Sequence, residues 1–231
     1  EMKVFASIII PAYNEKNTIL NTLNKINSQF KDKCDFEIIV IDDSSNDGTS
    51  EILKQNPDLY TNLINNEINL GKGGSIKKAL RLAKGNYIFF QDADDEYDPN
   101  DYLQFVDIIL KFQPDLIIGS RFHFNKYIRS HYFLNKVGNF IITNLFNIIY
   151  NTTFTDIYSC YVVYKKDLIN SNELKSVGFE QQAEILGKVV RNGKKFYEVP
   201  INYNGRTFEE GKKIKLTDFF KVIFQIIKSR L

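Results

Sequence analysis

A chain of 231 residues with 43% hydrophobic and 25% charged residues suits one large α/β domain or two small ones, and it excludes a disordered or fibrous protein. The net charge of +2 is unevenly distributed, because positions 186–231 hold 11 Lys and Arg against 4 Asp and Glu. This basic segment favours phosphate, nucleic acid or anionic lipid as a partner, with a solvated basic helix as the alternative.

Short β-branched and apolar runs alternate with helical patterns over the first 120 residues. The expected strands cover residues 4–10, 36–41, 59–64, 87–90 and 116–118. Between them, apolar residues recur at helical spacing, most clearly at 19–26, 76–83 and 102–112. This alternation predicts a doubly wound, mostly parallel sheet with helices on both faces.

The second half follows a different pattern. We expect a long apolar helix at 133–150, an aromatic strand at 158–164, a helix at 179–191, a strand at 195–199 and a final helix at 216–230. No linker or internal repeat separates the halves. We therefore expect one domain over 1–231 with a helical C-terminal elaboration.

Cysteine and histidine are too few to organise the fold. Cys34 and Cys160 support neither a disulfide framework nor a zinc site, and His123 and His131 are not spaced as a metal pair. A reducing, cytoplasmic setting is therefore expected. No apolar run approaches 18 residues, so we expect neither a signal peptide nor a membrane-spanning helix.

Five acidic residues stand within seven positions directly after the strand at 87–90. They are Asp92, Asp94, Asp95, Glu96 and Asp98. Carboxylates this close repel one another unless positive charge lies among them. The cluster is either a solvated loop or a site for Mg²⁺ or Mn²⁺, which take oxygen ligands and share them with phosphates. Its position favours the cation site, since ligands of open α/β sheets gather at the carboxyl ends of strands.

A glycine-rich loop at 71–74 precedes the third helical pattern. It is not a P-loop, because no Gly-Lys-Ser or Gly-Lys-Thr closes the required spacing, and Ile76 replaces the third glycine of the dinucleotide fingerprint. Such a loop at a helix N-terminus could approach a phosphate or a base, with Lys72 as its charged residue. A flexible turn is the equal alternative.

Several motifs follow the strands in a recognisable order. Pro-Ala-Tyr-Asn-Glu stands at 11–15, Asp-Asp-Ser-Ser-Asn-Asp-Gly-Thr at 42–49, Asn-Leu-Gly-Lys-Gly at 69–73 and Asp-Ala-Asp at 92–94. The series continues through Gly-Ser-Arg-Phe at 119–122, Thr-Asp at 155–156, Glu-Val-Pro-Ile at 198–201 and a Gly-Arg-to-Lys-Lys-Ile tail at 205–214. It resembles the family 2 glycosyltransferases of GT-A fold, most closely the polyprenyl-phosphate hexose synthases (dolichyl-phosphate mannose or glucose type).

The resemblance implies a nucleotide-diphospho-sugar at the carboxyl ends of the strands, bound in the half formed by 1–121. Glu15 and Asp42 would hydrogen-bond the base and ribose. Asp92 and Asp94, with Glu96 as a third ligand, would hold Mg²⁺ or Mn²⁺ against the diphosphate. The donor-binding set that it implies is Pro11, Ala12, Tyr13, Glu15, Asp42, Lys72, Asp92, Ala93, Asp94, Arg121, Arg206 and Lys212.

The acceptor implied by the resemblance is a lipid phosphate, bound by the half at 122–215 with its flexible basic tail. A phosphate oxygen is already anionic, so the reaction needs positive charge more than a general base. Arg129, with His131 as its alternative, would hold the acceptor phosphate. The implied catalytic residues are Asp94, Asp156, Arg206 and Lys212, with Asp156 orienting groups or acting as a base toward a hydroxyl acceptor.

The leading hypothesis is therefore inverting, metal-dependent transfer of a hexose from a UDP-glucose or GDP-mannose type donor to a polyprenyl phosphate. The tail pattern leans toward UDP-glucose. The alternatives are transfer to a sugar hydroxyl of a surface polysaccharide and a catalytically silent nucleotide-sugar-binding scaffold. No nucleic-acid partner is expected, and a homo-oligomer remains open.

The last segment, 216–231, combines apolar and basic residues without the length of a membrane span. Such a helix could lie on the cytoplasmic face of an anionic membrane as a peripheral anchor. Packing of its apolar residues against the domain is the alternative interpretation.

Overall fold

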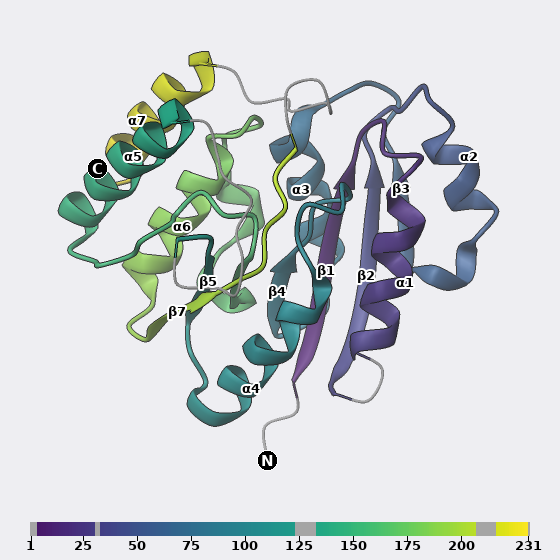
Figure 1. The fold of residues 1–231 in the computed structure, drawn as a ribbon, viewed down its shortest axis with the longest axis horizontal. Helices are drawn as coiled ribbons and strands as arrows, with labels where there is room; N and C mark the ends of the chain where they lie inside the picture. The colour runs from purple at the N-terminus through teal and green to yellow at the C-terminus, as the bar shows by residue number, and fades with distance from the viewer. Residues whose placement is uncertain (1–3, 31–32, 123–132, 207–215, 231) are drawn as a thin grey trace.

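The computed structural model describes residues 4–30, 33–122, 133–206 and 216–230, and its strands form one seven-stranded sheet in the order β3-β2-β1-β4-β6-β5-β7 (Figure 1). The strands are β1 (Phe5–Ala12), β2 (Asp35–Asp42), β3 (Asn62–Asn65), β4 (Tyr87–Phe90), β5 (Leu116–Ser120), β6 (Val162–Lys165) and β7 (Phe196–Pro200). β6 runs antiparallel to its neighbours β4 and β5, and the other pairings are parallel. The predicted fold class, a mostly parallel α/β sheet, is confirmed.

The helices cover both faces of this sheet. They are α1 (Ile19–Phe30), α2 (Thr49–Lys54), α3 (Gly71–Leu82), α4 (Tyr102–Phe112), α5 (Phe133–Tyr150), α6 (Gln181–Asn192) and α7 (Leu216–Arg230). Figure 1 shows α1 and α4 in front of the sheet and α3 behind it. Among the helices described, none is both long and apolar enough to cross a bilayer.

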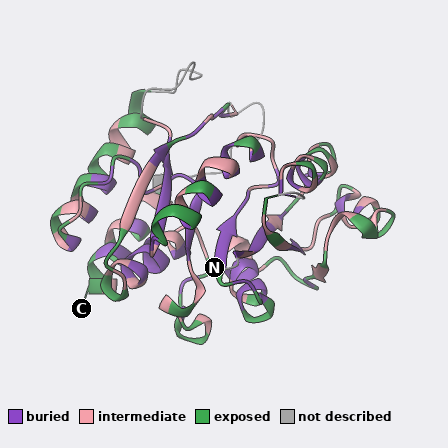
Figure 2. Cartoon of the chain, turned by 90° about the horizontal axis from the view of Figure 1, so that it is seen from below, coloured by how far each residue is buried: buried purple, intermediate pink, exposed green. Residues whose placement is uncertain are grey.

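The strands at the centre of the sheet are buried on both sides. Ile8, Ile9 and Ile10 follow one another in β1 and have no exposed surface. Consecutive buried residues in a strand require cover on both faces, which parallel sheets receive from their crossover helices. Figure 2 shows the same division, with buried strands inside and exposed residues on the outer faces of the helices.

The last helices form the predicted C-terminal elaboration. α7 packs against both α5 and α6. The hydroxyl of Tyr150 on α5 donates to the carbonyl of Ile226 at 3.1 Å, and Arg191 on α6 donates to the carbonyl of Ser229 at 2.9 Å. These bonds join the C-terminal helix to the rest of the fold.

Two predicted strands are shorter than the sequence suggested. The strand expected at 59–64 begins at Asn62, because Pro57 starts a 3₁₀ turn that ends at Leu59. The strand expected at 158–164 begins at Val162, because the preceding backbone is held by side chains: the amide of Cys160 donates to the hydroxyl of Tyr97 at 3.1 Å. An amide that donates to a side chain in this way is not available for strand pairing.

Candidate functional site

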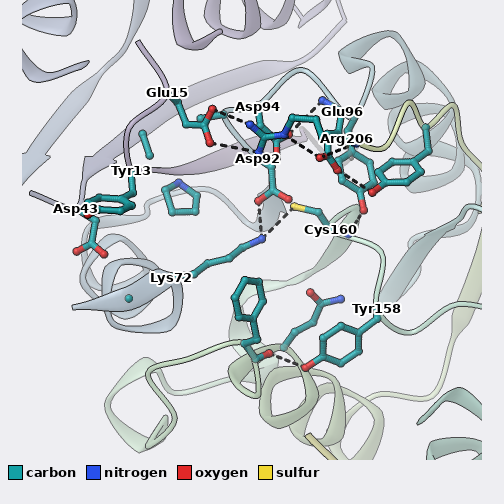
Figure 3. Close-up of a pocket in the computed structure, with 18 of the residues that line it drawn as sticks. Tyr13, Glu15, Asp43, Lys72, Asp92, Asp94, Glu96, Tyr158, Cys160 and Arg206 are labelled. Atoms are coloured by element: carbon teal, nitrogen blue, oxygen red, sulfur yellow. Dashed lines mark hydrogen bonds and ion pairs between the residues drawn. The ribbon is translucent and has the colours of Figure 1, made fainter. Parts of the chain in front are cut away.

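A cavity of about 320 Å³ lies where β1, β2 and β4 end (Figure 3). The parallel register brings these ends together, with Ala12 of β1 beside Asp42 of β2 and Ile9 of β1 beside Phe90 of β4. The predicted residues that line it are Pro11, Ala12, Tyr13, Glu15, Lys72, Asp92, Ala93, Asp94, Glu96, Arg121 and Arg206. Residues far apart in the sequence therefore share one wall.

The loops after β1 and β2 are tied together at the edge of the cavity. Asn14, with a left-handed φ of 57°, accepts a hydrogen bond from the amide of Asn46 at 2.9 Å. The amide of Glu15 donates to the hydroxyl of Thr49 at 3.0 Å. These bonds fix Glu15, which is buried, at the cavity wall.

Of the two adjacent carboxylates that end β2, the second faces the cavity. The predicted ligand Asp42 is buried and accepts from the amide of Ser45 at 3.4 Å, and it does not line the cavity. Asp43 does, held by Asn66 Nδ2 at 2.7 Å and the amide of Leu70 at 2.9 Å. Successive side chains of an extended backbone point to opposite sides, so the structure brings Asp43 to the cavity wall in place of the predicted Asp42.

The glycine-rich loop owes its glycines to packing. A Cβ on Gly73 would lie 2.6 Å from the carbonyl carbon of Val177, and Gly71 adopts a positive φ of 76°. Both glycines therefore serve the first turn of α3, Gly71 through its positive φ and Gly73 through its close approach to Val177. Lys72 of this loop lies in the cavity wall, where its Nζ is 2.5 Å from Asp92 Oδ1. Burial alone would lower the pKa of Lys72, but the charges of Asp92, Cys160 and Asp94 and the hydrogen bond to Asp92 together raise the pKa above its ordinary value.

Arg206 forms the centre of a second ion-pair group. Its guanidinium lies 2.7 Å from Asp94 Oδ2, 2.9 Å from Glu96 Oε1 and 3.3 Å from Glu15 Oε2. Tyr203 donates to the other oxygen of Glu96 at 2.7 Å. Figure 3 shows the three carboxylates converging on Arg206, with Glu15 from the loop after β1 and Asp94 and Glu96 from the loop after β4.

The cavity carries more negative than positive charge. Among the described lining residues, five carboxylates (Glu15, Asp43, Asp92, Asp94 and Glu96) face three cations (Lys72, Arg121 and Arg206). Burial, followed by the charges of Asp92 and Glu96, raises the pKa of Asp94 to about 7, although Arg206 opposes the shift. A site with this imbalance favours an additional cation.

The predicted metal ligands, Asp92, Asp94 and Glu96, are paired with cations of the protein. No three His, Cys, Asp or Glu side chains of the described residues stand together in a metal-binding arrangement. Asp92 faces Lys72, whereas Asp94 and Glu96 face Arg206. The oxygen donors and the excess negative charge nevertheless fit Mg²⁺ or Mn²⁺. Binding through Asp92 and Asp94 would require these carboxylates to exchange or share their present partners.

Asp156 lies behind the cavity rather than in it. It is fully buried, and its two oxygens accept from Arg121 Nε at 2.7 Å and Nη2 at 2.9 Å. Arg121 lines the cavity with its guanidinium 5.1 Å from the ring of Tyr203. Of the two roles expected for Asp156, this placement agrees with the orienting one, because both of its oxygens hold Arg121, and its role as a base stays a prediction.

Three predicted residues, Arg129, His131 and Lys212, lie outside the described residues. Besides Asp43, the cavity includes residues that are not among the predicted site residues: Asn69, Gly71, Tyr97, Tyr158, Cys160, Phe179, Gln182 and Tyr203. The last five come from the second half of the chain, on either side of β6. One local indication was available, because Gln182 follows a Gly-Phe-Glu-Gln run at the start of a predicted helix.

Comparison with known proteins places these observations in a family. The model described as Glycosyl transferase family 2 matches residues 7–171. The UDP-N-acetylglucosamine–dolichyl-phosphate N-acetylglucosaminyltransferase of Methanococcus voltae is 27% identical over 97% of this chain and 95% of its own length.

Solved structures show the same fold. S. aureus TarS 1-349 in complex with UDP-GlcNAc aligns with a TM-score of 0.66 at 21% identity, over 99% of this chain and 66% of that one. Glucosyl-3-phosphoglycerate synthase of Mycobacterium tuberculosis, in complex with Mn²⁺, UDP-glucose and phosphoglyceric acid, aligns with a TM-score of 0.71 at 16% identity, over 98% of this chain and 80% of that one. Both are GT-A fold glycosyltransferases.

Proposed function

The chain belongs to glycosyltransferase family 2 and is a glycosyltransferase of GT-A fold, and from that premise we propose that it transfers a sugar from a UDP-sugar to a polyprenyl phosphate. The transfer would invert the anomeric carbon by direct displacement. One observation carries the choice of acceptor: Asp156, the candidate base for a hydroxyl acceptor, is already paired with Arg121.

The donor would span the cavity, with its uridine near Tyr13 and its sugar near Cys160. Tyr13 and Asp43 would hold the uridine, because Figure 3 places them together at one side of the cavity. Asp92 and Asp94 would meet the diphosphate through Mg²⁺ or Mn²⁺, which supplies Lewis-acid stabilisation of the leaving nucleoside diphosphate. Solved structures of the same fold hold UDP-GlcNAc, or UDP-glucose with Mn²⁺, which supports a UDP-sugar donor and a divalent cation.

The chain's own cations would complete the charge balance. Arg206 would move from the carboxylates to the diphosphate, since a guanidinium binds phosphate oxygens in a bidentate manner. Arg121, fixed by Asp156, would face the acceptor phosphate. Lys212 in the tail, with Arg129 or His131 at the acceptor, remains a prediction outside the described residues.

A phosphate acceptor suits these groups. Its oxygen is anionic at neutral pH and attacks the anomeric carbon without losing a proton, so the residues need to bring two anions together. A hydroxyl acceptor would need a base, and Asp156 would have to break a buried ion pair to provide one. Membership of the family, together with Asp92 and Asp94 in the cavity wall, argues against a silent scaffold.

An apolar surface on α5 and α7 supports a lipid-bearing acceptor. The exposed apolar residues of these two helices are Phe133, Leu134, Phe140, Ile141, Ile148, Phe220, Phe224 and Ile227. Exposed Lys136, Lys221, Lys228 and Arg230 lie on the same helices. Apolar side chains with basic neighbours are typical of helices that lie in the interface of an anionic membrane.

The proposed reaction is tested by following nucleoside diphosphate release from UDP-sugars in Mn²⁺, with and without a short polyprenyl phosphate. We expect release to depend on the lipid phosphate. The matching polyprenol, which lacks the phosphate, should not replace it. Release at the same rate without any lipid phosphate would overturn the proposed acceptor.

Replacing Asp43 with Asn should weaken UDP binding by about tenfold, since a hydrogen bond to a charged group contributes about 1.5–3 kcal/mol. Titration calorimetry with UDP and Mn²⁺ measures the change. Asp42→Asn is the matched control, because Asp42 does not line the cavity, and its affinity for UDP should stay at the wild-type value. The reverse ranking of the two variants would restore Asp42 as the ligand.

Removing two exposed rings from α7, in the double variant Phe220→Ser and Phe224→Ser, should reduce binding to anionic vesicles by about tenfold or more, because each buried ring contributes about 1.5–3 kcal/mol. Co-sedimentation with phosphatidylglycerol vesicles measures it. The control is Leu110→Ser, which removes another exposed apolar side chain, from α4. An equal loss of vesicle binding in the double variant and in Leu110→Ser would show that the α5–α7 surface has no special role in membrane binding.

A further inference from the structure

A small side cavity of about 30 Å³ lies beside the main one. The two share Lys72, Cys160, Phe179 and Gln182 in their walls. Each water-sized group needs about 10–15 Å³ of such volume, so the side cavity has room for about two or three non-hydrogen atoms. It is large enough for a sugar substituent and far too small for a second sugar.

The wall of this side cavity is mainly apolar. Ile76 of α3, Phe90 at the end of β4 and Ile185 of α6 line it, and all three are buried. A hydroxyl placed among such side chains loses its hydrogen bonds to water without replacement. A methyl group gains free energy there, because its apolar surface is removed from water.

Gln181 supplies one polar group to the same wall. Its Nε2 donates to the carbonyls of Gly73 at 2.6 Å and Ser176 at 3.0 Å, which fixes which way the amide faces. Its Oε1 is buried and has no hydrogen-bond partner within the described part of the chain. A buried acceptor left without a partner costs about 1–3 kcal/mol, so a ligand N–H that reached it would be favoured.

The side cavity lies toward the sugar end of the donor as oriented above. Tyr13 and Asp43 stand at one side of the main cavity, and Cys160 and Tyr158 at the other (Figure 3). Asp92, between them, contacts Lys72 at 2.5 Å, and Cys160 lies 3.9 Å from the same Nζ. A sugar on the far side of the diphosphate from the uridine therefore comes next to the shared residues Lys72 and Cys160.

We propose that this side cavity binds the acetyl part of the acetamido group of a UDP-N-acetylhexosamine, with the amide nitrogen at its edge. The methyl group would pack among Ile76, Phe90 and Ile185, and the amide N–H would donate to Gln181 Oε1. The inference rests on the proposed function of the main cavity and replaces the leaning toward UDP-glucose. A hexose donor would leave the apolar wall unfilled and the Gln181 oxygen without a partner.

Competition binding with UDP, UDP-GlcNAc and UDP-glucose in Mn²⁺ tests the inference on the wild-type protein. We expect UDP-GlcNAc to bind about 10- to 200-fold more tightly than UDP-glucose, the range for a small apolar group in a matching pocket. Equal affinities, or a preference for UDP-glucose, would overturn the assignment of the side cavity. If UDP itself failed to bind, the result would contradict the proposed function and not only the assignment of the side cavity.

Two variants test whether the preference for UDP-GlcNAc depends on the side cavity. Ile185→Phe should fill the side cavity, and Gln181→Leu should remove the unpartnered oxygen. Ile185→Phe should abolish the preference for UDP-GlcNAc and Gln181→Leu should reduce it, while each variant keeps wild-type affinity for UDP, which also reports that it is folded. A preference that survives in every variant that still binds UDP would contradict the inference.

Discussion

Replacing Asp94 with Asn should lower turnover by about 10²- to 10³-fold, the usual loss when one electrostatic group at a developing charge is removed. Asp94 lies in the cavity wall between Asp92 and Glu96, and it would hold the cation that stabilises the leaving diphosphate. Asparagine keeps the shape but lacks the charge. The loss should appear in kcat with UDP-sugar, Mn²⁺ and polyprenyl phosphate.

The same variant should not be less stable than the wild type. Burial and two neighbouring carboxylates raise the pKa of Asp94 to about 7, above its ordinary value of 3.8. A raised carboxyl pKa means that ionisation is costly in the folded state, so above pH 7 the group opposes folding. Asparagine removes that cost, and thermal unfolding at pH 8 should show an equal or higher Tm for Asp94→Asn.

Asp95→Asn is the matched control for this experiment. Asp95 is the next residue, but its carboxylate turns away from the cavity and accepts from Asn21 at 2.6 Å and Thr22 at 3.2 Å on α1. We expect normal turnover. If Asp94→Asn kept wild-type turnover, or if Asp95→Asn lost as much, the cation would have to bind elsewhere.

Replacing Asp156 with Asn should destabilise the protein by about 3–5 kcal/mol, the usual loss when one partner of a buried ion pair is removed, because the half-buried guanidinium of Arg121 loses its fully buried charged partner. Asp156 is fully buried and holds Arg121 through both oxygens. At about 2–4 °C per kcal/mol for a protein of this size, Tm should fall by roughly 6–20 °C. Asp107→Asn, an exposed change on α4, should leave Tm unchanged.

The activity of Asp156→Asn separates a positioning role from a base. Arg121 without its partner should bind the acceptor less well, so KM for polyprenyl phosphate should rise while the shape of the pH–rate profile stays the same. A base would instead be needed in its ionised form, and its removal would abolish the acidic limb of that profile. Loss of that limb at normal Tm would contradict the positioning role.

The sequence predicted features that depend on local pattern. Consecutive apolar residues indicated the buried strands, and the acidic cluster after Phe90 was placed at the carboxyl end of β4, where Asp92 and Asp94 do line the cavity. Arg206 was expected beside the diphosphate site, and its guanidinium lies among Glu15, Asp94 and Glu96. Strand ends and charged motifs can be predicted from the sequence because the periodicity of apolar residues and the residues that favour turns determine them.

Other features depend on contacts between distant segments. Whether Asp42 or Asp43 faces the cavity depends on how β2 ends, and the composition of the motif does not determine this. The pairing of Asp156 with Arg121 joins residues 35 positions apart, which turns an expected base into a buried ion-pair partner. Likewise, Gln181 and Gly73 meet across 108 positions, so the side cavity had no sequence pattern of its own.

The central claim is that this chain transfers a sugar to a lipid phosphate with inversion. The most direct measurement is NMR of the lipid product formed from an α-linked UDP-sugar, Mn²⁺ and polyprenyl phosphate. We predict one sugar joined through phosphate to the lipid, with a β anomeric configuration. An α-linked product, or free sugar with the lipid phosphate unchanged, would contradict the account.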